Sequence, residues 1–138
     1  MPAKDIYHNI VSNALIKDGW KITDDPLFIQ SGGADMYVDL GAEQMIAAEK
    51  KGKKIAIEIK SFLQNSFISE FHTALGQYIN YRLALKNEEP ERVLYLAVSS
   101  DVDQEYFVIP FVQASLTTNQ IKYLVYDINN EVITKWKN

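Results

Sequence analysis

Glu58 and Lys60 place a carboxylate and an ammonium group two positions apart in an isoleucine-rich segment, AIEIKSF. Residues two apart in a β-strand point to the same face, so these side chains lie about 7 Å apart along it. A carboxylate that binds a divalent cation, beside a lysine that offsets negative charge, suits metal-dependent phosphodiester cleavage. The alternative is a solvated sheet face with an exposed ion pair, which contributes about 0–1 kcal/mol to stability.

The Glu-x-Lys spacing alone is weak evidence for a functional site, because both residues are common. The chain contains a second copy, Glu49-Lys50-Lys51, within a charged segment that is predicted to be a turn. Lysines gather there at Lys50, Lys51, Lys53 and Lys54. Such a cluster is either a solvated turn or a hairpin tip that contacts phosphates. Glu58 and Lys60 differ in context, since they end a predicted strand, follow a hairpin and precede a helix.

A magnesium site of this kind needs a second carboxylate close to Glu58. The preceding predicted strand offers Asp39. Because Asp39 has apolar neighbours on both sides, its side chain is expected to be fixed within the protein and not solvated. The expected ligands of Mg²⁺ (or Mn²⁺) are Asp39, Glu58 and the backbone carbonyl of Ile59. Lys60 would orient the attacking water and offset the developing charge. Asp35 is a weaker candidate ligand, and a strand-end aspartate without function is the alternative for Asp39.

The expected register of the hairpin leaves the second ligand open. A strict hairpin centred on Lys51-Gly52 would place Glu43 or Met45, not Asp39, opposite the end of the strand. A bulge at Gly41 would absorb that offset and bring Asp39 into place. Glu43 is therefore the reserve ligand.

Gln77 and Tyr81 stand four positions apart in a predicted helix, so they share one of its faces. An amide and a phenol at the sheet end would bind a phosphate or order a water molecule. The alternative is a core tyrosine beside a solvated glutamine. His8, on the first predicted helix, is placed where it could reach the site, although a lone helical histidine is more often structural; His72 is interpreted as structural.

Composition limits the broad class of protein. The 138 residues are enough for one domain, residues 1–138, with one core. There is no cysteine, which excludes disulfides and cysteine-based zinc sites. Neither an apolar run of about 20 residues nor a signal-peptide pattern is found, so no membrane association is expected and a cytoplasmic location is the default. The net charge of −4 argues against a generally basic nucleic-acid-binding surface.

Periodicity and turn residues predict the elements that must position these groups. The predicted order is α-β-β-β-α-β, then short helices and a final hairpin, which indicates an α/β fold with helices around a mixed sheet. The predicted segments are a helix over 4–18, strands over 20–22, 27–30, 36–40, 45–49 and 54–62, a helix capped by Ser66 or Ser69 and running to about 86, a buried strand over 93–98, short helices after Ser99-Ser100-Asp101 and after Pro110, and a hairpin of 121–127 with 132–136. A turn is expected over 23–26.

These residues resemble the PD-(D/E)xK nuclease superfamily. The resemblance rests on an Asp in a hairpin strand, then Glu-Ile-Lys-Ser, then Gln-x-x-x-Tyr in a helix, in the matching element order. It implies a restriction-endonuclease-like core and Mg²⁺-dependent cleavage of DNA. It also implies that Asp39 and Glu58 bind the metal, that Lys60 is catalytic, and that Gln77 and Tyr81 belong to the same site.

Longer segments resemble the XisH family, the fdxN element excision controlling factors. They are AKDIYHNIV, ALIKDGW, YVDLGAE, IAAEKKGKKIAIEIKSF, ALGQYINYRLAL and YLVYDINNEVI. The resemblance implies a role in programmed, site-specific excision of a DNA element, with DNA and a XisI-like companion protein as partners and a site-specific recombinase acting alongside. Two functions stay open: an active endonuclease, and a nuclease-like DNA-binding or regulatory subunit without catalysis. Assembly into a homo-oligomer is also left open.

Overall fold

The computed structural model describes residues 4–46 and 51–138. The helices are α1 (His8–Lys17), α2 (Phe67–Glu88), α3 (Ser100–Glu105) and α4 (Pro110–Thr118). The strands are β1 (Lys21–Asp24), β2 (Leu27–Ser31), β3 (Ala34–Val38), β4 (Leu40–Ile46), β5 (Lys51–Ile59), β6 (Arg92–Ser99), β7 (Tyr123–Asp127) and β8 (Val132–Lys137). Within these ranges, no helix combines the length and the apolar character needed to cross a membrane.

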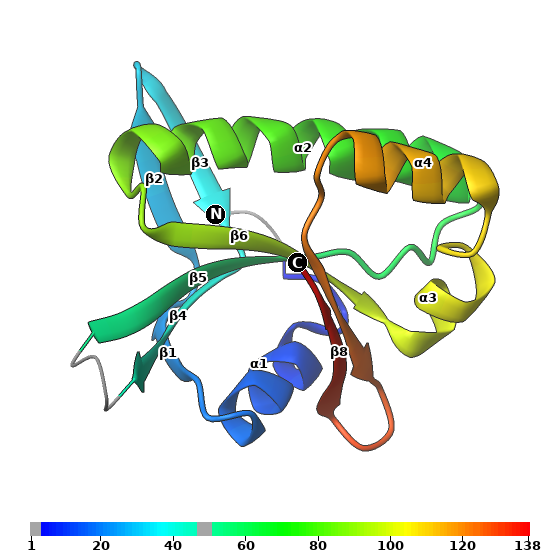
Figure 1. Ribbon diagram of the computed structural model, residues 1–138, viewed down its shortest axis with the longest axis horizontal. Helices are drawn as coiled ribbons and strands as arrows, with labels where there is room; N and C mark the ends of the chain where they lie inside the picture. Colours follow the sequence, from blue (N-terminus) through cyan, green and yellow to red (C-terminus); the bar gives the residue numbers. More distant parts are fainter. Residues whose placement is uncertain (1–3, 47–50) are drawn as a thin grey trace.

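Among the described residues, the main sheet has the strand order β1-β4-β5-β6-β7-β8 (Figure 1). The neighbours β5, β6 and β7 are parallel, and the pairs β1–β4, β4–β5 and β7–β8 are antiparallel. Helix α2 connects β5 to β6, and α3 and α4 connect β6 to β7, because parallel neighbours require a crossover. The predicted mixed α/β architecture is confirmed.

The strands β2 and β3 form a separate hairpin that packs against α2. Its turn passes through Gly32 and Gly33, which have φ angles of 55° and 85°. A two-residue turn with both φ angles positive matches the twist of the flanking strands and favours glycine at both positions. This hairpin leads directly into the bend at Asp39.

Helices cover both faces of the sheet (Figure 1). The core on the α1 side includes Val11, Ala14, Leu15, Ile55, Ile57 and Ile59. The core on the α2 side includes Ala56, Phe71, Ala74, Tyr78, Leu94 and Leu96. Because side chains alternate along a strand, Glu58 and Lys60 share the α2 face with Ala56. The polar end of β5 is therefore on the face that α2 covers.

Most predicted elements are present with shifted ends. The hydroxyl oxygen of Ser66 accepts a hydrogen bond from the N–H of Ser69 at 3.2 Å, so Ser66 caps α2. Ser99 caps α3 and Pro110 begins α4, as predicted. The buried strand and the final hairpin are also confirmed.

The predicted order α-β-β-β-α-β is incomplete, since five strands precede α2 in the part of the chain that is described. Asp24, predicted in a turn, belongs to β1 and pairs with Gly41 of β4. The segment is too short to show a period from sequence, and its pairing with β4 decides its conformation.

The register of β4 and β5 also differs from the prediction. The ladder runs without interruption from Leu40 opposite Ile57 to Ile46 opposite Lys51. Lys51 and the following glycine are therefore part of β5 and not a turn, and no bulge interrupts the ladder at Gly41. The prediction was wrong because a Lys-Lys-Gly-Lys segment has the composition of a turn. The remainder of the predicted strand, residues 47–49, and Lys50 lie outside the described residues.

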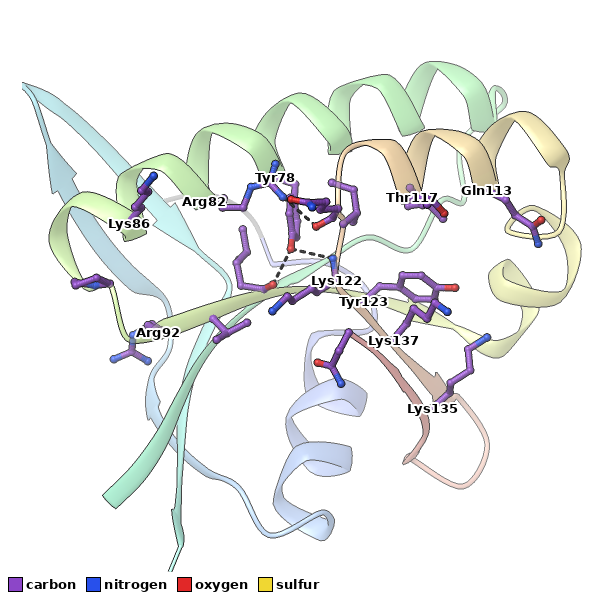
Figure 2. A pocket seen from close by; sticks show the side chains of 17 residues that line it. Tyr78, Arg82, Lys86, Arg92, Gln113, Thr117, Lys122, Tyr123, Lys135 and Lys137 are labelled. Atoms are coloured by element: carbon purple, nitrogen blue, oxygen red, sulfur yellow. Dashed lines mark hydrogen bonds between the residues drawn. The ribbon is translucent and has the colours of Figure 1, made fainter. Parts of the chain in front are cut away.

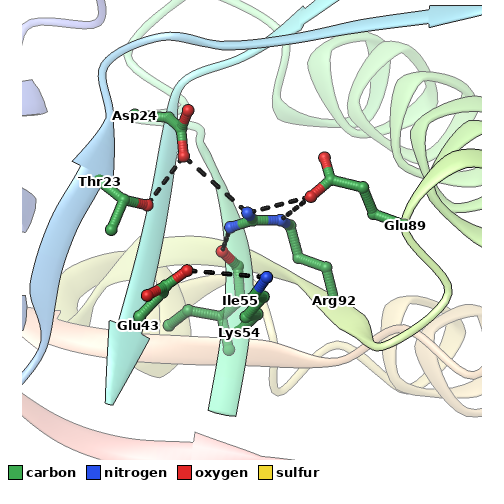
Figure 3. A network of polar contacts seen from close by, with 7 residues as sticks. All are labelled: Thr23, Asp24, Glu43, Lys54, Ile55, Glu89 and Arg92. Atoms are coloured by element: carbon green, nitrogen blue, oxygen red, sulfur yellow. Dashed lines mark hydrogen bonds and ion pairs between the residues drawn. The ribbon is translucent and has the colours of Figure 1, made fainter. Parts of the chain in front are cut away.

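Gly41 instead gives room to a buried arginine, Arg92, and Figure 3 shows the polar contacts of that arginine. Arg92 is 8% exposed and donates hydrogen bonds to the carbonyl of Ile55 at 2.9 Å and to Glu89 Oε1 at 3.1 Å. Its Nη2 lies 3.9 Å from Asp24 Oδ2. A Cβ atom at position 41 would lie 2.8 Å from Asp24 Oδ2 and 3.0 Å from Arg92 Nη1. The network ties β1, β5, β6 and the end of α2 together.

Candidate functional site

The register of β4 and β5 brings Asp39 opposite Glu58. Asp39 occupies the bend between β3 and β4, directly before Leu40. Its Oδ2 accepts a hydrogen bond from the N–H of Ile59 at 2.7 Å, and its own N–H donates to Glu58 Oε1 at 3.3 Å. Each carboxylate is therefore held by the backbone of the opposite segment. The two predicted carboxylates come together, without the bulge that the prediction invoked.

Glu58 lies in surroundings that disfavour its negative charge. The residue is 6% exposed. The pKa of its carboxyl is raised from 4.5 to about 8, first by burial and next by the negative charge of Asp39, while the Lys60 ammonium group acts in the opposite direction. At pH 7 the carboxyl is therefore mostly protonated, unless a metal cation binds beside it in addition to the Lys60 ammonium group.

Lys60 points to the same face as Glu58, as predicted. Its Nζ lies 3.6 Å from Glu58 Oε2, and its side chain is 26% exposed, so it faces the carboxylate and remains accessible. The backbone around it is fixed on both sides. Its N–H donates to the carbonyl of Ala97 at 3.1 Å, and the N–H of Ser61 donates to Asp5 Oδ2 at 3.2 Å.

Tyr81 and Gln77 lie on one flank of α2. The pKa of the Tyr81 phenol is raised from 10 to about 12, mainly by burial and further by the charges of Glu58 and Asp39, which places it within their electrostatic reach. Gln77 lies one helical turn before Tyr81 on the same flank. Its Oε1 is buried and has no hydrogen-bond partner among the residues described. Buried polar atoms are nearly always paired, so this oxygen is free to accept a bond from a ligand or water.

Glu43 and Asp35 are not near the site. Glu43 pairs with Lys54 in the ladder, and its Oε1 lies 3.8 Å from Lys54 Nζ. Lys54 precedes Glu58 by four residues, or about 13 Å along the strand. Asp35 is exposed in the β2–β3 hairpin, opposite Gln30. Both alternatives to Asp39 are therefore wrong, since the true register moves Glu43 toward the far end of β5.

His8 does not contact the paired carboxylates. It begins α1, is 4% exposed, and its Nε2 lies 2.9 Å from Asp25 Oδ1. Helix α1 packs on the face opposite α2, so the idea that His8 reaches the site is wrong, and a structural pairing with Asp25 takes its place. His72 is exposed on α2.

Sequence reasoning missed Asp5 and the Asp25 partner of His8. Asp5 accepts hydrogen bonds from Tyr7 and Ser61, which fixes the chain just after Lys60. The contact joins residues that are 56 positions apart. No local pattern signals such a pair, because Asp5 has the appearance of an ordinary helix-start aspartate.

The donor set suits a hard divalent cation. Asp39 and Glu58 supply carboxylate oxygens. In an extended residue the N–H and C=O point to the same side, so the carbonyl of Ile59 faces the Asp39 side together with its N–H. Within the described part of the chain, no group of three or more His, Cys, Asp or Glu residues could hold a metal ion. Mg²⁺ needs only one or two carboxylates with several waters, so these residues fit it.

The chain is similar to a family model and to two solved structures. The model described as XisH protein matches residues 1–134. The crystal structure of an XisH family protein from Nostoc punctiforme PCC 73102 is 50% identical, with a TM-score of 0.89, and the match covers 97% of this chain and 100% of that one. The crystal structure of a fdxN element excision controlling factor protein from Anabaena variabilis is 51% identical, with a TM-score of 0.90, covering 98% and 100%. The comparison with curated proteins gives no match.

Proposed function

The chain belongs to the XisH family, and on this premise we propose that it cleaves phosphodiester bonds of DNA with Mg²⁺ (or Mn²⁺) during programmed excision of a DNA element. The family and the description of the Anabaena variabilis relative as an excision controlling factor support the DNA-rearrangement part of the proposal. The arrangement of α1, β4, β5, α2 and β6 supports a restriction-endonuclease-like core of the PD-(D/E)xK type.

The pairing of Asp39 with Glu58 carries the cleavage proposal. Asp39, Glu58 and the carbonyl of Ile59 would hold the metal. When bound, Mg²⁺ would lower the pKa of a coordinated water and stabilise negative charge on the phosphate. A cation also offsets the burial and the repulsion by Asp39 that together raise the pKa of Glu58, so its binding and the loss of the Glu58 proton are linked.

The neighbouring side chains have distinct roles in this proposal. The Lys60 ammonium group offsets the negative charge that develops on the phosphate, as a compact point charge. The Tyr81 phenol keeps its proton well above neutral pH, since its pKa is about 12, and donates a hydrogen bond to a phosphate oxygen. The unpaired Oε1 of Gln77 accepts a hydrogen bond from the attacking water.

The net charge of −4 favours a second candidate function. In that case the chain is a DNA-binding or regulatory subunit that does not cleave, and it acts with a XisI-type partner and a recombinase. The two candidates differ in turnover: the regulatory subunit would bind DNA or its partner without producing any cut strand.

A cleavage assay tests the proposal. Purified protein is incubated with supercoiled and linear DNA and with Mg²⁺ or Mn²⁺, alone and with the companion protein. We expect nicked or linear products that disappear in EDTA and with Glu58→Ala or Lys60→Ala, and that persist with Lys54→Ala, a lysine of the same strand outside the site. DNA left intact under every condition, with stable complex formation, would favour the regulatory candidate.

A further inference from the structure

A groove of about 1080 Å³ opens beside α2 and is lined largely by basic and polar side chains (Figure 2). Its walls come from α2, from α4 and the segment that connects α4 to β7, from the first residues of β6 and β7, and from the end of β8. Six of its lining residues are basic: Arg82, Lys86, Arg92, Lys122, Lys135 and Lys137. Among the described residues that line the groove, none has a carboxylate side chain. In a chain of net charge −4, this is a local concentration of positive charge.

The groove is separate from the paired carboxylates. Tyr78, Arg82 and Lys86 line it, and their spacing of four residues places them along one flank of α2. Gln77 and Tyr81 occupy a different flank. With 3.6 residues per turn, the centres of the two flanks are separated by roughly 120° around the helix axis. A ligand in the groove is therefore not a ligand of the Asp39–Glu58 site.

Three of the six cations are free to meet a ligand. Arg92 is paired with Glu89 and Asp24, and Lys135 Nζ lies 3.1 Å from Asp103 Oδ2. In contrast, no ion pair within the described ranges involves Lys86, Lys122 or Lys137.

Arg82 has a structural part in the groove. It donates to the carbonyls of Asn119 and Gln120 at 2.9 Å and 3.0 Å, and its guanidinium group lies 5.3 Å from the centre of the Tyr78 ring. These contacts hold the end of α4 against α2. The wall of the groove is thus fixed before a ligand arrives.

The chemistry of the lining favours phosphate groups over an apolar protein partner. Of the apolar side chains that line it, Leu94, Leu116 and Ile121 are buried in the core, and only Pro90 and Val93 are more accessible. The polar side chains Gln113, Thr117 and Gln120 add hydrogen-bonding groups. Protein interfaces need an apolar centre, whereas lysines spaced along a groove suit the repeated charges of a phosphodiester chain.

We propose that this groove binds the phosphodiester backbone of a nucleic acid through Lys86, Lys122 and Lys137. The choice of nucleic acid over another polyanion rests on the proposed function, in which DNA is the substrate. The aromatic rings that line the groove, those of Tyr78 and Tyr123, are buried and offer little surface for stacking bases, so binding follows charge and not sequence. The groove holds a part of the strand that lies away from the carboxylates.

Fluorescence anisotropy in EDTA tests this proposal, because binding is then measured without cleavage. Labelled single-stranded and duplex oligonucleotides are titrated at several salt concentrations with the wild type and with the triple variant Lys86→Ala, Lys122→Ala, Lys137→Ala. The matched control replaces Lys4, Lys17 and Lys21, exposed lysines outside the groove, by Ala. We expect the groove variant to bind about tenfold or more weakly and its slope of log K against log salt to be smaller by about 2 to 3, with the control unchanged.

Several results would overturn the proposal. Equal losses in the groove variant and the control would show a general charge effect, and an unchanged groove variant would show that DNA binds elsewhere. Displacement of the oligonucleotide by poly-glutamate as well as by inorganic polyphosphate would indicate an acidic protein segment as the ligand. If the triple variant does not fold, each single Lys→Gln variant is measured in the same way. Binding that persists when Glu58→Ala abolishes cleavage would support the groove independently of the carboxylate site.

Discussion

The backbone N–H of Asp39 donates a hydrogen bond to the carboxylate of Glu58, while the carboxylate of Asp39 accepts one from the N–H that follows Glu58. This reciprocal arrangement holds two acidic groups close together, although their negative charges repel each other. Burial and mutual repulsion raise the pKa of Glu58 to about 8. The fold thus keeps a pair that costs stability when ionised, as is common at functional sites.

The pH dependence of stability should report Glu58. The folded pKa of about 8 lies above the unfolded value of 4.5, so the folded state binds the proton more tightly. The stabilisation that protonated Glu58 gives to the folded state is fully present below pH 4.5 and is lost as the pH rises through about 8. The Glu58→Gln variant cannot ionise at this position, so it does not lose this stability at high pH. We expect it to be more stable than the wild type by roughly 3–5 kcal/mol above pH 8. Urea unfolding in EDTA at pH 5, 7 and 9 measures the difference, and a gap that does not grow with pH would contradict the assignment.

Metal binding should depend on pH in the opposite sense. A cation displaces the Glu58 proton, so we expect the apparent affinity for Mn²⁺ to rise about tenfold per pH unit between pH 6 and 8. Thermal unfolding with and without Mn²⁺ measures this as a growing increase in Tm. Glu43→Gln serves as the control because Glu43 is a half-exposed carboxylate outside the site. An equal loss of the Tm shift in Glu58→Gln and Glu43→Gln would point to non-specific binding.

Lys60 should matter for cleavage more than for metal binding. Its ammonium group lies 3.6 Å from Glu58 Oε2, and the Lys60 side chain is partly exposed. We expect Lys60→Ala to lower the cleavage rate about 10²- to 10³-fold at pH 9. Lys54→Ala should stay within about twofold of the wild type. Full activity of Lys60→Ala at pH 9 would remove Lys60 from the mechanism.

Substitution by alanine at two glycines, Gly41 and Gly76, should change the stability of the fold in opposite directions. Gly41→Ala would place a Cβ 2.8 Å from Asp24 Oδ2 and 3.0 Å from Arg92 Nη1, and we expect it to destabilise the fold by about 1–3 kcal/mol. Gly76 lies inside α2, and a Cβ added there would meet no described atom within 4 Å, so Gly76→Ala should stabilise by about 0.5–1 kcal/mol. Urea unfolding of both variants compares them directly. A neutral Gly41→Ala would mean that the Arg92 network can move aside.

Local patterns were sufficient to identify the charged end of β5 and the helix that carries Gln77 and Tyr81. Alternation places Glu58 and Lys60 on one face whatever the surrounding fold, and a spacing of four places Gln77 beside Tyr81 on a helix. The cap at Ser66 and the start of α4 at Pro110 follow from backbone chemistry that acts within a few residues.

The strand register and the long-range contacts could not be predicted from local sequence patterns. A shift of a few residues in the β4–β5 register decides whether Asp39 or Glu43 faces Glu58, and the turn-like composition of the lysine-rich segment favoured the wrong alternative. The contact of Asp5 with Ser61 and that of Arg92 with Asp24 join segments far apart in the chain. The basic groove likewise gathers lysines from α2, from the residue before β7 and from β8, which are scattered in the sequence.

Anomalous diffraction from crystals soaked in Mn²⁺ above pH 8 tests the metal-binding role of Asp39 and Glu58 most directly. We predict one strong manganese peak between the two carboxylates, within about 2.2 Å of an oxygen of each, and its loss in Asp39→Asn crystals. Well-ordered crystals at saturating Mn²⁺ that show no peak there, or a peak bound only by other residues, would contradict a metal-dependent site at Asp39 and Glu58.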